Sequence, residues 1–285
     1  MMFQIGEIKV PRGIPKNGVR MTKKRIAEIQ ANAVEMAADS KFSINERFSF
    51  IEDIVGMLVA GKQASVIVAG SGGLGKSYTV TKALEANGLT DMTDLPSFED
   101  GVRYDSRKSY TTVKGFSTTK GLYRILYENK NSTILMDDTD SVMKDPNSLN
   151  LLKAALDSYS KRIISYRADI RDEDLPNFFE FKGSVVFLTN TPSKLLDQAL
   201  TSRSMVVDLS MTAEQKLERM AFILEQNEFM PEVPMDMKID ALKLITKVYQ
   251  SVKDLSLRTL IQVIRIRETN PHGRWERLAE YTITN

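Results

Sequence analysis

A glycine-rich segment carries residue types that bind phosphate. Residues 70–77 follow the pattern G-x-x-x-x-G-K-[ST] and lie between an apolar run, residues 65–69, and a stretch with helical character. Glycines let backbone N–H groups surround a phosphate, and the helix start adds partial positive charge. The lysine would reach the β- and γ-phosphates, and the serine hydroxyl would coordinate Mg²⁺. The expected nucleotide site comprises Gly70, Ser71, Gly72, Gly73, Leu74, Gly75, Lys76, Ser77 and Tyr78.

Three aspartates after a second apolar run supply the carboxylates that such a site needs. Asp137 and Asp138 follow residues 134–136, and Asp140 comes two positions later. P-loop NTPases place a magnesium-binding carboxylate at such a strand end, beside the phosphates. We expect Asp137 to hold the ion through its water shell and Asp138 to orient or deprotonate the attacking water. The alternative is a polar turn that caps the next helix, which applies most directly to Asp140 and Ser141.

The elements around these motifs indicate an α/β fold. Short runs rich in β-branched residues alternate with helical segments, and three of them are continuously apolar, as in strands buried on both faces. This alternation predicts a mostly parallel sheet flanked by helices, the fold of ASCE-type P-loop NTPases. The expected strands span residues 65–69, 109–113, 133–136, 161–166, 184–189 and 205–209.

After residue 209 only helical patterns follow, which predicts a small all-α lid domain. Residues 212–215 have the form of a capping box that opens a helix through about residue 226, and further helices are expected at 237–253 and 256–268. A helix at 44–60 should end at Gly61. The predicted domains are a basic arm and helix at 1–45, the nucleotide-binding domain at 46–210 and the lid at 211–285.

The positive charge of the chain is concentrated at its start. Residues 1–25 carry seven basic side chains and one acidic one, a net +6, whereas the whole chain carries +2. This arm would contact nucleic-acid phosphates or an acidic protein surface. The other interpretation is a solvated leader. A helix with its N-cap at Thr22 is expected after it, from the spacing of Ile26, Ile29, Ala33, Val34 and Ala37.

Composition excludes several other classes of site. The chain has no cysteine, which excludes disulfides and thiolate zinc sites. It has one histidine, His272, which excludes a metal site with several histidines. Apolar stretches such as residues 54–60 are far shorter than the roughly 20 residues of a membrane helix. No signal-peptide pattern opens the sequence. We therefore expect a cytoplasmic protein without a membrane partner.

These two motifs, with three later segments in the same order, resemble the AAA+ ATPase family. Thr189-Asn190, after the apolar run 185–188, resembles sensor 1, which touches the γ-phosphate and the attacking water. Residues 200–204 resemble the segment that carries the arginine finger, with Arg203 at the matching position. Residues 255–260 resemble sensor 2, with Arg258 reaching the phosphates. The chain also resembles small AAA-type ATPases of tailed bacteriophages, which implies a host-cytoplasmic location.

The resemblance implies Mg²⁺-dependent ATP hydrolysis in a ring, most often a homo-hexamer. A finger supplied by the neighbouring subunit would stabilise charge on the transferring phosphoryl group. Arg162 and Arg167 are rival candidates for this role, and surface ion pairs are the alternative for Arg203 and Arg258. The family usually has glutamate where this chain has Asp138, so slow turnover is one expectation.

A loop after the second expected strand corresponds to the family's substrate-gripping pore loop. Lys114 and Phe116 would hold either a nucleic-acid backbone or an extended peptide. The other interpretation places Phe116 in the core. Three functions follow: an ATP-driven ring acting on DNA as helicase, loader or translocase, an ATP-dependent protein remodeller, and a slow nucleotide-gated assembly protein.

Overall fold

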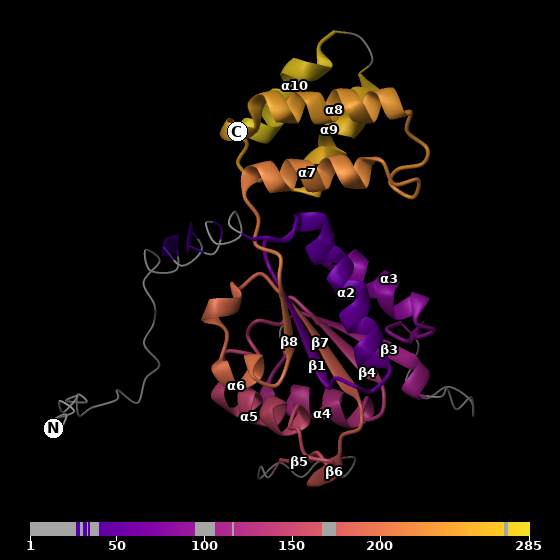
Figure 1. The fold of residues 1–285 in the computed structure, drawn as a ribbon, viewed down its shortest axis with the longest axis vertical. Helices are drawn as coiled ribbons and strands as arrows, with labels where there is room; N and C mark the ends of the chain where they lie inside the picture. The colour runs from indigo at the N-terminus through magenta and orange to yellow at the C-terminus, as the bar shows by residue number, and fades with distance from the viewer. Residues whose placement is uncertain are drawn as a thin grey trace, which may run out of the picture.

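A six-stranded parallel sheet forms the centre of the molecule (Figure 1). The computed structural model describes residues 40–94, 106–115, 117–166, 175–270 and 273–285, with residues 27, 28, 31, 32 and 34. The strand order β2-β3-β4-β7-β1-β8 confirms the predicted α/β P-loop fold. The strands are β1 (Ser65–Ala69), β2 (Thr90–Asp91), β3 (Ser109–Lys114), β4 (Thr133–Asp137), β7 (Ser184–Thr189) and β8 (Met205–Asp208).

Helices cover both faces of this sheet because successive strand side chains point to opposite sides. In β7, Val186 and Leu188 pack with helices α2 (Ile44–Val59) and α3 (Lys76–Ala86). The alternate residues Val185 and Phe187 pack with α4 (Thr119–Glu128) and α5 (Pro146–Ala155) on the other face. Both faces being buried explains why the strands read as continuous apolar runs.

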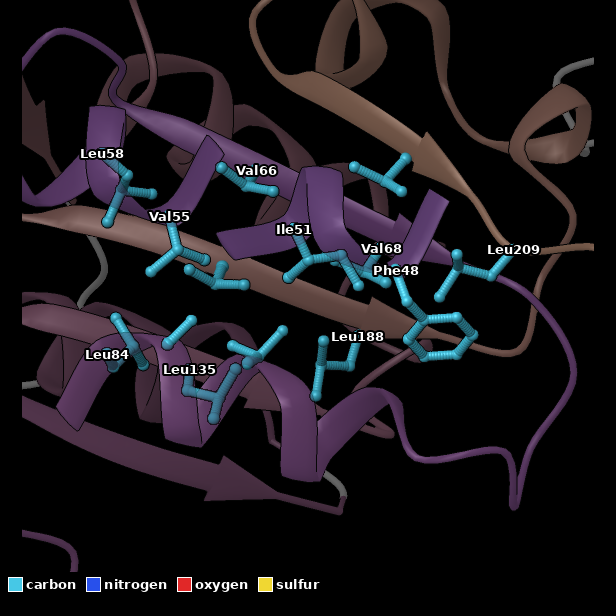
Figure 2. Packing of buried hydrophobic residues seen from close by; sticks show 14 of the residues in the cluster. Phe48, Ile51, Val55, Leu58, Val66, Val68, Leu84, Leu135, Leu188 and Leu209 are labelled. Carbon is cyan, nitrogen blue, oxygen red and sulfur yellow. The ribbon is translucent and has the colours of Figure 1, made fainter. Parts of the chain in front are cut away.

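Helix α2 closes one face of the sheet and ends as predicted. Its N-cap Ser43 and Glu46 form a capping box, and Gly61 follows the helix with a φ of 69°. Phe48, Ile51, Val55 and Leu58 point from one side of α2 toward β1 and β7 (Figure 2). Most of the helix expected after Thr22 lies outside the described residues, although residues 27, 28, 31, 32 and 34 are helical.

The strand predicted at 161–166 belongs to a different sheet. Residues Ile163–Ser165 form β5, which pairs antiparallel with β6 (Phe178–Glu180) in a separate two-stranded sheet. Its assignment to the main sheet was wrong, because β5 pairs with β6 and with no strand of the parallel sheet. Only Ile164 of its three residues is buried, so β5 packs on one face alone, unlike β1, β4 and β7, which are buried on both faces. Neither β6 nor the two-residue β2 was predicted.

Four helices follow the sheet and form their own apolar cluster. The capping box at Thr212 and Gln215 begins α7 as predicted. The third helix of the group, expected at 256–268, is also confirmed, whereas the second ends at Val248 and continues as a short 3₁₀ turn. The exact domain boundaries stay predictions. The helices are α7 (Ala213–Leu224), α8 (Met235–Val248), α9 (Leu257–Thr269) and α10 (Trp275–Thr284).

Two arginines tie these helices to the sheet region. The guanidinium of Arg47 in α2 donates to the carbonyl oxygen of Ser210, at 2.9 Å, in the segment between β8 and α7. Arg219 of α7 lies 3.7 Å from the ring centroid of Phe48 and donates to Asn45 at 2.9 Å. Burial lowers the pKa of Arg219 to about 10.

Within the described part of the chain, no helix is long and apolar enough to span a bilayer.

The alignment of β4 and β7 depends on a close approach at Gly183, just before β7. A Cβ at this position would lie 2.3 Å from the carbonyl oxygen of Ser132. We expect Gly183→Ala to lower the free energy of unfolding by about 3 kcal/mol, measured by urea denaturation. Gly56→Ala is the control, because a Cβ there has its closest neighbour at 3.6 Å. Equal stability of the two variants would contradict the close approach.

Candidate functional site

The loop between β1 and α3 is shaped by glycines at its two ends. Gly70 has a φ of 149°, and a Cβ there would lie 2.9 Å from the backbone carbonyl carbon of Leu209. Gly75 is the N-cap of α3 with a φ of 94°. Because glycine has no side chain to cap this helix, the N–H groups of the first turn are available for an anion. Leu74 is fully buried and holds the loop in the core.

Lys76 lies in the middle of the site with its ammonium group nearly enclosed. The residue is 7% exposed, and Nζ donates to the carbonyl oxygen of Gly70, to that of Ser71 at 3.0 Å and to Oδ1 of Asn190 at 2.9 Å. Burial lowers the pKa of Lys76 to about 8, while the negative charges of Asp138, Asp137 and Asp140 oppose this shift. The ammonium therefore depends on three oxygen atoms from two segments, the loop after β1 and the residue after β7.

The aspartates at the end of β4 lie opposite the loop. Oγ of Ser77 donates to Oδ2 of Asp137 at 3.0 Å. A hydroxyl beside a carboxylate is the oxygen-donor set that Mg²⁺ takes when the remaining ligands are phosphates and water. No group of three or more histidine, cysteine, aspartate or glutamate residues within the described ranges forms a metal cage. The Ser77 hydroxyl and the Asp137 carboxylate are oxygen donors of the type that would hold a magnesium ion together with a phosphate.

Asn190 connects Lys76 to Asp138. Its Oδ1 accepts from Lys76, and its Nδ2 donates to Oδ1 of Asp138 at 2.9 Å. Asp138 has a φ of 53°, in the left-handed region, so the chain turns sharply after β4. The strand order β4-β7-β1 explains the arrangement, because the carboxyl ends of three adjacent parallel strands meet at one edge.

Asp140 does not cap the next helix, so that alternative is wrong. The N-cap of α5 is Asp145, whose side chain accepts from the backbone N–H of Ser148. Asp140 instead accepts from the hydroxyls of Thr189 and Thr191, on either side of Asn190. No pattern in the sequence indicated either threonine contact.

The start of α9 contacts the loop between β1 and α3, residues 70–75, which is called the phosphate loop below. The backbone N–H of Leu257 donates to the carbonyl oxygen of Gly73 at 2.8 Å, and Ser256, the N-cap of α9, is fully buried. A Cβ on Gly73 would lie 3.9 Å from Cδ of Arg258. The aliphatic part of the Arg258 side chain therefore lies beside the loop, and the residue is exposed.

Tyr78 follows the loop but its side chain is directed elsewhere. The residue is 56% exposed, and its hydroxyl donates to the carboxylate of Glu228, between α7 and α8. This contact raises the pKa of Tyr78. Lys82 binds the same carboxylate at 3.2 Å. A phosphate in the loop would therefore meet the backbone N–H of Tyr78 rather than its ring.

Arg203 lies at the edge of the sheet where the amino ends of β1 and β8 are, whereas the phosphate loop of the same chain follows the carboxyl end of β1. It precedes β8, where Met205 pairs with Val66 near the start of β1. Its Nη1 donates to the carbonyl oxygen of Ala199 at 3.0 Å, and its buried Nε has no hydrogen-bond partner within the described structure. A cavity of about 1060 Å³ at this edge is lined by Arg203 and Arg162, and none of the phosphate-loop residues lines it.

The rival finger residues differ in their surroundings. The guanidinium of Arg162 donates to the carbonyl oxygens of Ala155 and Gly183, each at 2.8 Å. Burial lowers the pKa of Arg162. These two backbone contacts hold it within its own chain. Arg167 lies outside the described residues.

The two expected pore-loop residues are described unequally. Lys114 is exposed at the end of β3, where it pairs in register with Asp137. It therefore lies at the same sheet edge as the phosphate loop. Gly115 follows it with a φ of 85°, and Phe116 lies outside the described residues.

The fold and the glycine loop define an α/β protein with the P-loop nucleotide-binding architecture. No family model matches the sequence. The chain is 30% identical over 263 residues to an uncharacterized 36.7 kDa protein from the nrdC–mobD intergenic region of Enterobacteria phage T4. The alignment covers 86% of this chain and 76% of the phage protein. This chain therefore belongs to the same family as that T4 protein.

Two solved structures are also similar. Domain III of the Thermotoga maritima replication initiation protein DnaA matches with a TM-score of 0.45 and 14% identity, over 83% of this chain and 92% of that one. PCH-2 of C. elegans matches with a TM-score of 0.44 and 13% identity, over 84% of this chain and 67% of that one.

The buried ammonium group predicts a specific pH dependence. Between pH 8, near the lowered pKa of Lys76, and its ordinary value of 10.5, the folded chain loses a proton that the unfolded chain keeps. Stability of the wild type should therefore rise relative to Lys76→Met in this window, by at most about 1.4 kcal/mol per pH unit. Urea denaturation of both proteins at several pH values measures the difference. A difference independent of pH up to 10.5 would contradict the enclosed ammonium.

Proposed function

We propose that this protein is an ATPase of the AAA+ type that binds Mg·ATP at the edge formed by the ends of β1, β4 and β7. The observation that carries the proposal is the convergence of Lys76, the Ser77–Asp137 pair and the Asp138–Asn190 pair on one loop. Each group is of a type that phosphoryl transfer to water requires.

Each residue has a separate role in the proposed reaction. Backbone N–H groups of residues 70–78 bind the phosphates, and Lys76 exchanges its carbonyl partners for phosphate oxygens. Ser77 and Asp137 hold the magnesium ion, which neutralises charge on the β- and γ-phosphates when bound. Asp138 accepts a proton from the attacking water, and Asn190 fixes the position of that water.

Arg258 would add positive charge from the helical part of the molecule. Its stem lies beside Gly73, and within the described structure no ion pair involves its guanidinium. A bound triphosphate would attract this group and draw α9 against the loop. Nucleotide binding would thereby change the contact between α9 and the sheet.

The proposed active assembly is a homo-oligomeric ring, most simply a hexamer. Arg203 lies at the edge opposite its own loop, so its guanidinium would act on the nucleotide of a neighbouring subunit. A head-to-tail contact of this kind closes into a ring when the rotation between subunits allows it. Since the T4 relative is a phage protein, we place this assembly in the cytoplasm of the infected host.

Mixed assemblies test the shared site. Asp138→Asn subunits should bind ATP without cleaving it, and Arg203→Ala subunits should lack the neighbour's guanidinium. In an equal mixture about a quarter of the interfaces combine an intact Asp138 with an intact Arg203, so turnover should reappear. Steady-state phosphate release measures this recovery. Absence of recovery at every mixing ratio would contradict a finger supplied by the neighbour.

The proposed macromolecular substrate is DNA, supported by the net charge of +6 on residues 1–25. Lys114 would add a cation at the sheet edge, and Phe116 an aromatic ring that stacks on bases. The competing function is remodelling of unfolded protein by the same loop. An aromatic residue beside a lysine also suits an extended peptide.

The stimulation of ATP turnover separates these substrates. We expect DNA to raise the rate more than RNA or unfolded protein, with a steep salt dependence, because arm cations displace counterions from phosphates. Deleting residues 1–25 should remove this salt dependence. Replacing the seven basic arm residues with glutamine, at unchanged length, should have the same effect. Stimulation by unfolded protein alone would favour the remodeller, and tight ATP binding with negligible turnover would favour the gated assembly protein.

A further inference from the structure

One carboxylate holds both residues that flank Asn190. Oδ1 of Asp140 accepts from the hydroxyl of Thr189 at 2.6 Å, and Oδ2 accepts from the hydroxyl of Thr191 at 2.8 Å. The Thr189 hydroxyl in turn accepts from the backbone N–H of Thr191 at 2.9 Å. Thr189 and Thr191, on either side of Asn190, are therefore both fixed to a single side chain on the neighbouring loop.

The hydrogen bonds of Asp140 with Thr189 and Thr191, called the clamp below, join the two segments that carry the proposed catalytic groups. Thr189 is fully buried at the end of β7, and its carbonyl oxygen accepts from the N–H of Gly70 at 3.2 Å. Asn190 is exposed and follows the strand, so backbone pairing in the sheet does not hold it. Asp140 lies two residues after Asp138, on the turn that begins with a left-handed residue. The distance between Asp138 and Asn190 therefore depends on how these two loops are joined.

We propose that Asp140 is a positioning residue that acts through Asn190. It holds the Asn190 amide where one end meets the Lys76 ammonium and the other meets the Asp138 carboxylate. A carboxylate suits this task because each of its two oxygens accepts from a separate hydroxyl, whereas an amide offers one acceptor oxygen. The inference rests on the proposed function, in which Asp138 and Asn190 act on the attacking water.

Replacing Asp140 by asparagine tests the clamp with little change in side-chain volume. The variant loses one of the two acceptors, so Asn190 should shift from its bridge. We expect kcat for ATP to fall on the order of 100-fold, because small misplacements of reacting groups have effects of this size. The Kd for Mg·ATP should stay within about twofold, since the phosphate loop itself is unchanged. Loss of ATP affinity with unchanged kcat would overturn the proposal.

Asp145→Asn is the matched control. Asp145 also accepts from a threonine hydroxyl, that of Thr119 at 2.8 Å, but it caps α5 and its hydrogen bonds are to Thr119 and Ser148 rather than to the neighbours of Asn190. Asparagine is also a good N-cap residue, so the helix should be retained. This variant should keep the kcat of the wild type. An equal loss of kcat in both variants would indicate a general effect of removing a carboxylate and would overturn the proposal.

A double-mutant cycle separates positioning from general structural damage. If Asp140 acts through Asn190, then Asp140→Asn should lower kcat in the wild type and have little further effect in Asn190→Ala. Thr191→Val should reproduce the loss of kcat, and Thr191→Ser, which keeps the hydroxyl, should restore most of it. Independent effects that multiply in the double variant would overturn the proposal.

A readout without turnover keeps the clamp testable on its own. The side-chain amide resonances of Asn190 in ¹⁵N-labelled protein should shift between wild type and Asp140→Asn but not between wild type and Asp145→Asn. Unchanged resonances in Asp140→Asn would overturn the clamp. A wild type that hydrolyses no ATP would instead contradict the proposed function, and the resonances would still decide whether Asp140 positions Asn190.

Discussion

The organisation of the site depends on one enclosed ammonium group. Lys76 is 7% exposed, so its charge is stable only with oxygen acceptors around it. The loop provides two carbonyl oxygens, and Asn190, which follows β7, provides a third oxygen. Burial lowers the pKa of Lys76, and the negative charges of three nearby aspartates oppose this shift only in part. In the proposed function, the oxygens of a phosphate ligand would replace these neutral partners with charged ones.

The parallel sheet gives this ammonium its surroundings. Because β7 lies between β4 and β1, Asn190 follows the strand between the aspartates and the phosphate loop. Gly183 and Ser132 fix where β7 and β4 begin, and the strand lengths then decide where they end. The helical part completes the edge through the bond from Leu257 to Gly73. A ligand in the loop would therefore be sensed by both parts of the molecule.

The sequence predicted the features that depend on neighbouring residues. The strand–loop–helix unit around residues 70–77 and the capping box at Thr212 are local patterns, and both occur in the structure. Features that depend on distant contacts were missed or misassigned. Strand β5 has a single buried residue, Ile164, so its three-residue pattern does not distinguish one sheet from another.

Contacts between residues far apart in the sequence also limit how much of the site could be predicted. Asp140 meets Thr189 and Thr191 across separations of 49 and 51 residues, which no local pattern reveals. The carbonyl partners of Arg162 are likewise known only from the fold. By contrast, the edge on which Arg203 lies follows once β8 is known to run parallel to β1.

Titration calorimetry of Mg·ATP into the full chain tests the central claim most directly. We expect saturable heat with one nucleotide per chain, and a loss of affinity on the order of 10- to 100-fold in Lys76→Ala, because a charge-assisted contact to phosphate is removed. Circular dichroism of both proteins establishes that they are folded. Absence of heat at millimolar ligand with folded wild type, or equal affinity in the two proteins, would contradict the account.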